Sequence, residues 1–546
     1  MKKTDQFRAE SRQTLLGGAA TVGASVMVVK IIGLLYKIPL MNVLGAEGMG
    51  YFNSAYEIYL IFCMIATAGL PVAMSALISK YLAEGNVKKI GQIYKSSIRA
   101  FTVAGLLGFA VMLLGADLLA GLMKNSNARD GIAALSPGVL LIFLTGVLRG
   151  YFQGHGDMKP TAISQMIEAA GKLLFGLLFS TLAVKKGLAV PQASACAVLG
   201  LTLGSALSTA YLLIEKHRRS PKCIDGVVPG VQYGRQSPLR ELLRIAMPIT
   251  LGAFITSMTR LLDTFLILRR LQHMGFSEAL ANSIYGSYTT LALPIFNLVP
   301  SLTAGVALSL VPMLSSAIQK GDRTTEQSLL RSAVKIEAIL ALPASLGIAA
   351  FSKQILNTVY GNHADAVELT APLLSVLAVS ILLSCLITST SAILQAYGRV
   401  DLPVISTLVG AAVKLLTGYL LIGNPNVGIL GAPISTLVCN ATVLTLNYTL
   451  VCRHAHPIKG AVGSLLKLLL SSGISVAAAM LAYYFLDTVL RIPHSTLNTL
   501  ASVALAAGIY LITVLSLHAL SDDELEMIPL IKRIRRTPKK KDIQLN

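Results

Sequence analysis

Charged residues are scarce in this chain of 546 residues, where Asp, Glu, Lys and Arg make up 13% and hydrophobic residues 54%. Soluble proteins carry about 25% charged residues, so this composition excludes an ordinary soluble protein. Acids are scarcer than bases, with 26 Asp and Glu against 46 Lys and Arg, which gives a net charge of +20. The cations lie in short loops beside apolar runs, so we interpret the surplus as a topology signal and expect no nucleic-acid partner.

Signatures of catalysis and of metal binding are also missing. The six cysteines show no CxxC or CxxH spacing, so neither a zinc site nor a disulfide framework is indicated. The sequence contains no Walker motif, no GxSxG and no HExxH. We therefore expect a protein that is not an enzyme and has no resident metal or cofactor, and leave open Na⁺ or H⁺ as a coupling ion.

Long apolar runs recur along the whole chain and predict an all-α polytopic membrane protein. The runs are continuous rather than alternating, which disfavours a membrane β-barrel. The first run is too long for a signal-peptide core and is interpreted as an uncleaved first span. The fourteen predicted segments are 15–40, 52–79, 97–120, 132–152, 160–184, 192–215, 245–268, 284–317, 332–352, 369–396, 402–423, 428–452, 462–487 and 496–520.

The distribution of Lys and Arg between the loops supports this number of segments. When the N-terminus is placed in the cytoplasm and the loops alternate, 33 of these residues lie on the cytoplasmic side and 8 on the outer side. Five more, Lys30, Lys37, Lys172, Arg260 and Lys414, lie inside segments, and cations close to a cytoplasmic segment end, such as Arg149, are counted with the adjoining loop. This bias follows the positive-inside rule, so we predict that both termini are cytoplasmic.

Sparse but collinear matches indicate an internal repeat. Gly50 pairs with Gly286 at an offset of 236 residues, and Lys172 pairs with Lys414 at an offset of 242. Each repeat has six segments, so both enter the membrane from the same side and form parallel repeats, with a substrate path between them. The predicted organisation is an N-lobe (1–215), a cytoplasmic linker (216–243), a C-lobe (244–452), two further helices (453–520) and a basic cytoplasmic tail (521–546).

Charges inside the predicted segments are the candidate functional residues, because each costs about 2.5–3.5 kcal/mol to insert. Glu168 lies four residues before Lys172, and Asp263 lies three residues after Arg260, so each pair shares a helix face. These pairs are interpreted either as structural ion pairs or as part of a water-filled cavity. Lys37, near a segment end, is explained as well by snorkelling as by function. The predicted substrate-binding cations are Lys30, Arg149, Lys172, Arg260 and Lys414, and the predicted gating or paired acids are Glu57, Glu168 and Asp263.

The cationic surplus among these residues favours an anionic substrate, such as a phosphate or pyrophosphate headgroup. The segment RGYFQGHGDMKPTAISQMIEAAGK, residues 149–172, resembles the hallmark segment of SpoVB/MurJ-type flippases of the MOP superfamily, and residues 69–86 resemble the end of that family's second span. Members often carry Arg where this chain has Lys172, and lysine binds phosphate as a point charge rather than through two parallel hydrogen bonds.

The resemblance implies two lobes around a central cavity that opens alternately to the two sides of the bacterial cytoplasmic membrane. It implies an undecaprenyl-pyrophosphate-linked sugar as cargo, with the peptidoglycan precursor lipid II the leading candidate, and a groove for the lipid tail in the last two segments. Anionic membrane lipids are expected partners of the basic linker and tail. Two alternatives stay open, which are a cation-coupled multidrug exporter of the same superfamily and a non-transporting scaffold for cell-wall or spore-cortex synthesis enzymes.

Overall fold

The protein forms two compact units, each described here by itself. The structure, a computed structural model, describes residues 2–218, 238–454, 461–489 and 495–517, and every regular element in these ranges is a helix. Most of the predicted linker and the whole predicted basic tail lie outside the described residues. Unit 1 comprises Met1–Pro294, Tyr360–Leu373 and Ala411–Ser435, and unit 2 comprises Ile295–Val359, Leu374–Gly410 and Thr436–Asn546. The predicted lobe boundaries stay a prediction.

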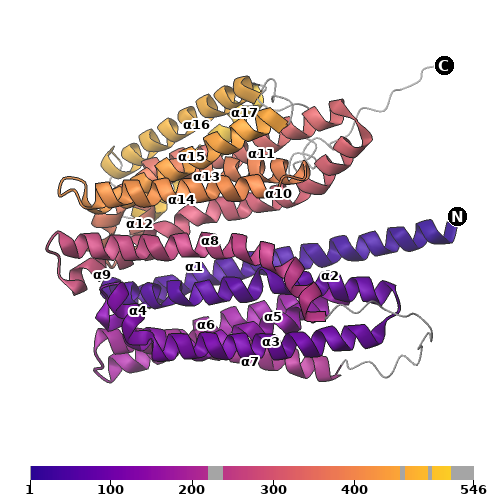
Figure 1. Cartoon of the computed structure of the whole chain (residues 1–546). Helices are drawn as coiled ribbons and strands as arrows, with labels where there is room; N and C mark the ends of the chain where they lie inside the picture. The colour runs from indigo at the N-terminus through magenta and orange to yellow at the C-terminus, as the bar shows by residue number, and fades with distance from the viewer. Residues whose placement is uncertain (1, 219–237, 455–460, 490–494, 518–546) are drawn as a thin grey trace, which may run out of the picture. The chain divides into compact units, whose positions relative to one another are not determined.

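Unit 1 contains the first nine α-helices, whose long members run roughly parallel to one another (Figure 1). These helices are α1 (Lys2–Thr67), α2 (Gly69–Ala83), α3 (Val87–Leu114), α4 (Ala116–Leu122), α5 (Arg129–Gly154), α6 (Lys159–Lys185), α7 (Val190–Arg218), α8 (Pro238–His273) and α9 (Glu278–Ser287). A 3₁₀ turn, η1 (Ser126–Ala128), precedes α5, and a π-helical turn, η2 (Tyr288–Ala292), follows α9.

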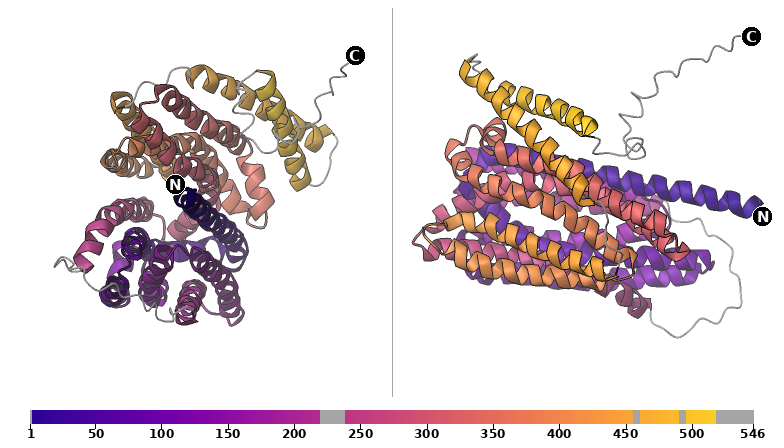
Figure 2. Two further views of the ribbon diagram at one scale, coloured as in Figure 1. Left: turned by 90° about the vertical axis from the view of Figure 1, so that its right-hand side faces the viewer. Right: turned by 90° about the horizontal axis from the view of Figure 1, so that it is seen from above.

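Unit 2 contains most of the second half of the chain, although α13, α14 and α15 are divided between the two units, the turn η3 belongs to unit 1, and α10 and α12 each contribute one or two end residues to unit 1. The helices are α10 (Leu293–Lys320), α11 (Arg323–Ala350), α12 (Ser352–Tyr360), α13 (Ala364–Ala396), α14 (Asp401–Ile422), α15 (Gly431–His454), α16 (Ala461–Tyr484) and α17 (Ser495–Ser516), with short turns η3 (Gly428–Leu430) and η4 (Phe485–Val489). Helices α16 and α17 lie side by side (Figure 2), and buried Leu468 and Tyr510 join them to Leu342 of α11.

Helix α1 is a hairpin rather than one straight rod. Gly45 has φ 68° and ψ −178°, a left-handed conformation that glycine tolerates and that interrupts the helix. The rings of Tyr36 and Phe52 lie 6.1 Å apart between centroids. Sixteen residues of uninterrupted helix would separate them by about 24 Å, so the chain folds back between them.

This hairpin confirms the predicted number of membrane segments. Thirteen helical stretches among the described residues are long and apolar enough to cross a membrane, and the first, Val28–Ala83, is 56 residues long. A helix of that length would span about 84 Å, whereas the hydrocarbon core is about 30 Å thick. The reversal at Gly45 therefore divides it into two crossings, which brings the total to the fourteen that the sequence predicts.

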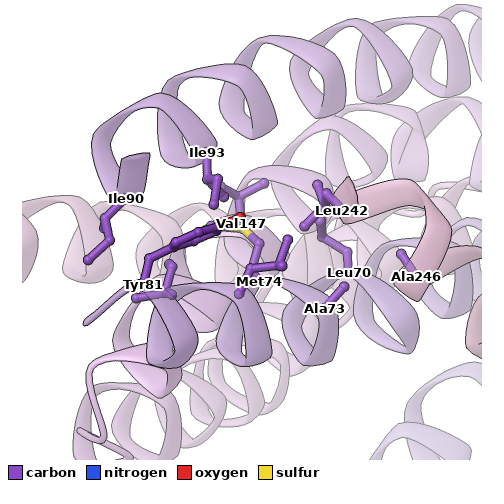
Figure 3. Close-up of a cluster of buried hydrophobic side chains, with 11 residues drawn as sticks. Leu70, Ala73, Met74, Tyr81, Ile90, Ile93, Val147, Leu242 and Ala246 are labelled. Carbon is purple, nitrogen blue, oxygen red and sulfur yellow. The ribbon is translucent and has the colours of Figure 1, made fainter. Parts of the chain in front are cut away.

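A buried apolar cluster in unit 1 joins helices that are distant in sequence (Figure 3). Leu70 and Met74 of α2 pack there with Val147 of α5 and with Leu242 of α8. Gly69, at the start of α2, permits this approach, since a Cβ at its position would lie 2.3 Å from the carbonyl oxygen of Ala246. Helix α2 is thereby held against both α5 and α8.

Helices α6 and α7 approach each other through glycines on both sides. A Cβ at Gly200 would lie 2.2 Å from the backbone nitrogen of Gly176, and one at Gly204 would lie 2.6 Å from the backbone oxygen of Glu168. Small residues four apart allow membrane helices this close contact. The approach brings α7 directly behind the part of α6 that carries the candidate charges.

We expect Gly200→Ala to destabilise the protein by about 2 kcal/mol, because the added methyl group overlaps backbone atoms that cannot move aside. Gly91→Ala is the matched control, since it is also a helical glycine and a Cβ there meets nothing within 4 Å. Thermal unfolding in detergent measures both variants. Equal melting temperatures for the two would contradict the close α6–α7 contact.

Candidate functional site

Arg149 is the centre of a buried polar network between α5, α6 and α7. Its Nη2 lies 2.8 Å from Glu168 Oε2, its Nε donates to Ser164 Oγ at 2.9 Å, and Nη2 also donates to Ser208 Oγ at 3.3 Å. The arginine is buried at 7% exposure. One guanidinium thus links three helices of unit 1 and fixes their rotation.

This network corrects the predicted partner of Glu168. The spacing along α6 pairs Glu168 with Lys172, but the carboxylate forms its ion pair with Arg149 of the preceding helix. A planar guanidinium that also reaches two serine hydroxyls competes well against an ammonium one turn away. Glu168 therefore has a structural partner, and Lys172 does not share it.

Lys172 lies against an aromatic cage formed by both arms of the α1 hairpin. Its Nζ is 4.5 Å from the ring centroid of Tyr56, 5.3 Å from that of Tyr36 and 6.0 Å from that of Phe52. Within the described part of the chain, Lys172 forms no ion pair. Ring faces attract an ammonium without neutralising it, so the positive charge is held in place and stays available.

Asp263 and Lys414 form the second ion pair of unit 1. Lys414 Nζ lies 2.8 Å from Asp263 Oδ2, and the side chains are 13% and 14% exposed. The spacing along α8 left open an ion pair between Asp263 and Arg260, and the structure does not show that pair, because Arg260 instead donates to Ser257 Oγ at 3.3 Å. Helical spacing reports only neighbours on the same helix, whereas Lys414 reaches Asp263 from α14.

Glu57 lies near these groups and has a carboxylate oxygen without a partner in the described part of the chain. Its Oε2 is buried without a hydrogen-bond partner. Arg260, Lys37, Asp263 and Lys414 are the charged groups that act on its carboxylate, with Arg260 the strongest. Glu57 is therefore in the electrostatic environment of both the exposed Arg260 and the Asp263–Lys414 pair.

Lys37 belongs to the same cluster, although the sequence left its role open between snorkelling and function. Its Nζ donates to the backbone oxygen of Thr289 at 3.1 Å, inside the π-helical turn η2. Asn53 donates to the hydroxyls of Thr289 and Thr290, each at 2.9 Å. A π turn weakens the regular backbone hydrogen bonding of a helix, and polar side chains from both arms of α1 bind at this turn. Lys37 therefore points inward, and snorkelling to a membrane surface does not explain it.

Eight charges of unit 1 form what we call the charge cluster: Lys37, Glu57, Arg149, Glu168, Lys172, Arg260, Asp263 and Lys414. Five are cations and three are acids, so the cluster has a formal positive surplus. Lys30 is not among them, because its side chain is exposed on α1 and the structure gives it no ion pair in the described residues. An anionic ligand would neutralise the positive surplus of the cluster.

Unit 2 holds an acid that the sequence analysis missed. Glu337 of α11 is fully buried and accepts a hydrogen bond of 2.7 Å from Ser389 Oγ of α13. Its Oε2 has no partner among the described residues. Its position inside the predicted segment 332–352 was the signal in the sequence that could have identified it.

Comparison with known proteins adds family-level information to this geometry. Residues 15–318 match the family described as polysaccharide biosynthesis protein, and residues 284–420 match the family described as MatE. The chain is 24% identical to stage V sporulation protein B of Bacillus subtilis (strain 168) over 526 residues, which is 96% of this chain and 99% of that protein. It is 25% identical to the lipid II flippase MurJ of the same organism over 512 residues, 91% of this chain and 93% of that protein.

A solved structure supports the fold. The inward closed conformation of a lipid II flippase MurJ superposes with a TM-score of 0.69 at 16% sequence identity, covering 90% of this chain and 97% of the other. At that identity the similarity concerns the fold alone. The sequence-based resemblance to SpoVB/MurJ-type flippases of the MOP superfamily is thus confirmed.

Proposed function

Because this chain belongs to the polysaccharide biosynthesis protein family of membrane transporters, we propose that it is a flippase for an undecaprenyl-pyrophosphate-linked cell-wall precursor, lipid II in particular. The observation that supports this most directly is the positive surplus of the charge cluster in unit 1. A pyrophosphate diester carries one negative charge on each phosphate, which matches two unneutralised cations.

The two cations best placed for this headgroup differ in character. Arg260 is exposed on α8 and uses one described hydrogen bond, to Ser257, so its remaining N–H donors can bind phosphate oxygens in parallel. Lys172 adds a point charge that the aromatic cage holds in position. Arg149 and Lys414 are already paired with Glu168 and Asp263, so we assign them to alignment of the helices and to switching between states.

We propose alternating access as the mechanism, with the prenyl tail remaining in the lipid while the headgroup crosses inside the protein. In this proposal the protein lies in the cytoplasmic membrane of a bacterial cell, and both of its termini face the cytoplasm. The inside-negative potential would favour outward movement of the anionic headgroup by about 2.3 kcal/mol per charge for every 100 mV. A coupling ion, Na⁺ or H⁺, would add to this drive, and cell-wall synthesis enzymes are the expected partners on either side.

Proteoliposomes with fluorescent lipid II test this proposal. We expect the purified chain to expose the labelled headgroup to a membrane-impermeant quencher faster than protein-free vesicles do. A potassium diffusion potential with a negative lumen should then shift the label toward the outer leaflet, whichever way the protein is inserted. Identical quenching with and without the protein would overturn the proposal.

A cation-coupled multidrug exporter is the second candidate, since residues 284–420 match the MatE family. The positive surplus of the charge cluster disfavours a cationic drug by simple repulsion. Ethidium efflux from the same vesicles, measured without lipid II, separates the two candidates. Efflux that depends on the protein, together with unchanged lipid II accessibility, would favour the exporter.

A further inference from the structure

A groove of about 690 Å³ opens on unit 1 where the first half of α3 faces the start of α8, away from the charge cluster. Four polar residues of α3 line it, and Val103 and Leu239 supply apolar walls. The four polar residues are Gln92, Lys95, Ser96 and Arg99. None of them has a role in the transport proposed above.

The two cations of this groove are not neutralised by the protein. Lys95 and Arg99 are exposed, lie one helical turn apart, and form no ion pair among the residues that the structure describes. Glu241, an acid near the start of α8, binds Lys80 at 3.3 Å and Tyr81 at 2.6 Å instead. The groove therefore presents two positive charges beside two neutral polar groups, which is the chemistry that holds a phosphate.

An exposed apolar stripe continues from the cations along α3 and turns gradually around the helix. Val103, Leu107, Val111 and Leu114 are 57%, 63%, 55% and 82% exposed. Together with Lys95 and Arg99 they follow one another at intervals of three or four residues, so each side chain neighbours the next along a row that is inclined to the helix axis and turns gradually around α3. The stripe runs about 22 Å from Arg99 to Leu114, more than half of the hydrocarbon core, which is about 30 Å thick.

We propose that this groove is a binding site for an anionic phospholipid of the cytoplasmic leaflet. The phosphate lies between Lys95 and Arg99, with Gln92 and Ser96 as hydrogen-bonding neighbours, and one acyl chain follows the stripe. The loop before α3 lies on the side that the distribution of Lys and Arg predicts to be cytoplasmic, where anionic lipids concentrate. The site is independent of the proposed cargo, because it lies on different helix faces and takes a lipid as a resident ligand.

The sequence allows a direct test, because it contains no tryptophan. Val103→Trp places a single fluorophore at the junction of groove and stripe, and Leu174→Trp places one on the exposed face of α6 as a control. Each full-length variant is reconstituted in phosphatidylcholine vesicles that contain brominated phosphatidylglycerol or, separately, brominated phosphatidylcholine. Bromine quenches tryptophan on contact, so quenching above the mole fraction of the brominated lipid measures preferential binding.

We expect quenching of Trp at position 103 to show about a tenfold preference of the groove for phosphatidylglycerol over phosphatidylcholine. The added changes Lys95→Gln and Arg99→Gln should remove this preference. Quenching of Trp at position 174 should simply be proportional to the mole fraction of the brominated lipid. The proposal is overturned if the preference survives both substitutions, or if it is equally strong at position 174, which would indicate a general surface charge. Loss of the preference in 50 mM inorganic phosphate at constant ionic strength would also overturn it, by identifying a free phosphate site.

Discussion

Replacing Arg149 with methionine is expected to destabilise the protein by about 3 kcal/mol, because it leaves the Glu168 carboxylate without its counter-charge inside a membrane segment. Methionine fills much of the space of the arginine stem, so the loss reports the guanidinium rather than a cavity. Thermal unfolding in detergent gives the value. In the double variant, Glu168→Gln should restore most of the lost stability, since a neutral amide at position 168 needs no counter-charge.

The control for this experiment lies on the same helix. Arg129 at the start of α5 pairs with Asp117, but those side chains are 54% and 75% exposed. Arg129→Met should therefore cost less than about 1 kcal/mol. If Arg149→Met and Arg129→Met cost the same, or if Glu168→Gln deepens the defect of Arg149→Met, the buried network does not hold α5, α6 and α7 together.

Neutralising Lys172 and Arg260 together is expected to slow lipid II flipping by at least about 100-fold, because two charge-assisted contacts to the pyrophosphate of about 1.5–3 kcal/mol each are lost. Lys172→Gln and Arg260→Gln each remove one charge with little change in size. The headgroup-accessibility assay in vesicles measures the rate. Lys172→Arg should keep most of the rate, since a guanidinium also binds phosphate and stacks on the Tyr56 ring.

A matched variant separates this effect from the general loss of positive charge. Lys185→Gln removes a cation from the exposed end of α6, outside the charge cluster, and is expected to leave the rate unchanged. The melting temperatures of all variants should stay within a few degrees of the parent. Full activity in the doubly neutralised protein would rule out Lys172 and Arg260 as the headgroup site.

Much of the fold could be predicted from the sequence, because hydropathy and loop charge act locally along the chain. The fourteen segments and the break between the first two follow from apolar runs and from the polar interval around Gly45. The helix boundaries are less accurate. Helix α8, for example, runs from Pro238 to His273, well beyond the predicted segment 245–268, since amphipathic ends extend past the apolar run.

The sequence predicted which residues belong to the candidate site, but not which of them form ion pairs with one another. Seven of its eight members are predicted to be functional from the free energy that it costs to insert a charge into the membrane. For the eighth, Lys37, the sequence left snorkelling and function open. The same-helix ion pairs that the spacing left open are not those of the structure, because Glu168 pairs with Arg149 and Asp263 with Lys414. Spacing within one helix carries no information about which neighbouring helix packs there, and contacts between helices decide the partners.

The aromatic cage around Lys172 also has a consequence for the order in which the protein is made. Tyr36, Phe52 and Tyr56 leave the ribosome more than a hundred residues before Lys172 does. The aromatic cage that binds the Lys172 ammonium is thus already in the membrane when α6 is inserted. Three rings that attract a cation offset part of the roughly 2.5–3.5 kcal/mol that a lone lysine costs at the membrane centre. The α1 hairpin therefore acts as an assembly partner for a later helix, and a defect in the cage would first appear as poor insertion of α6.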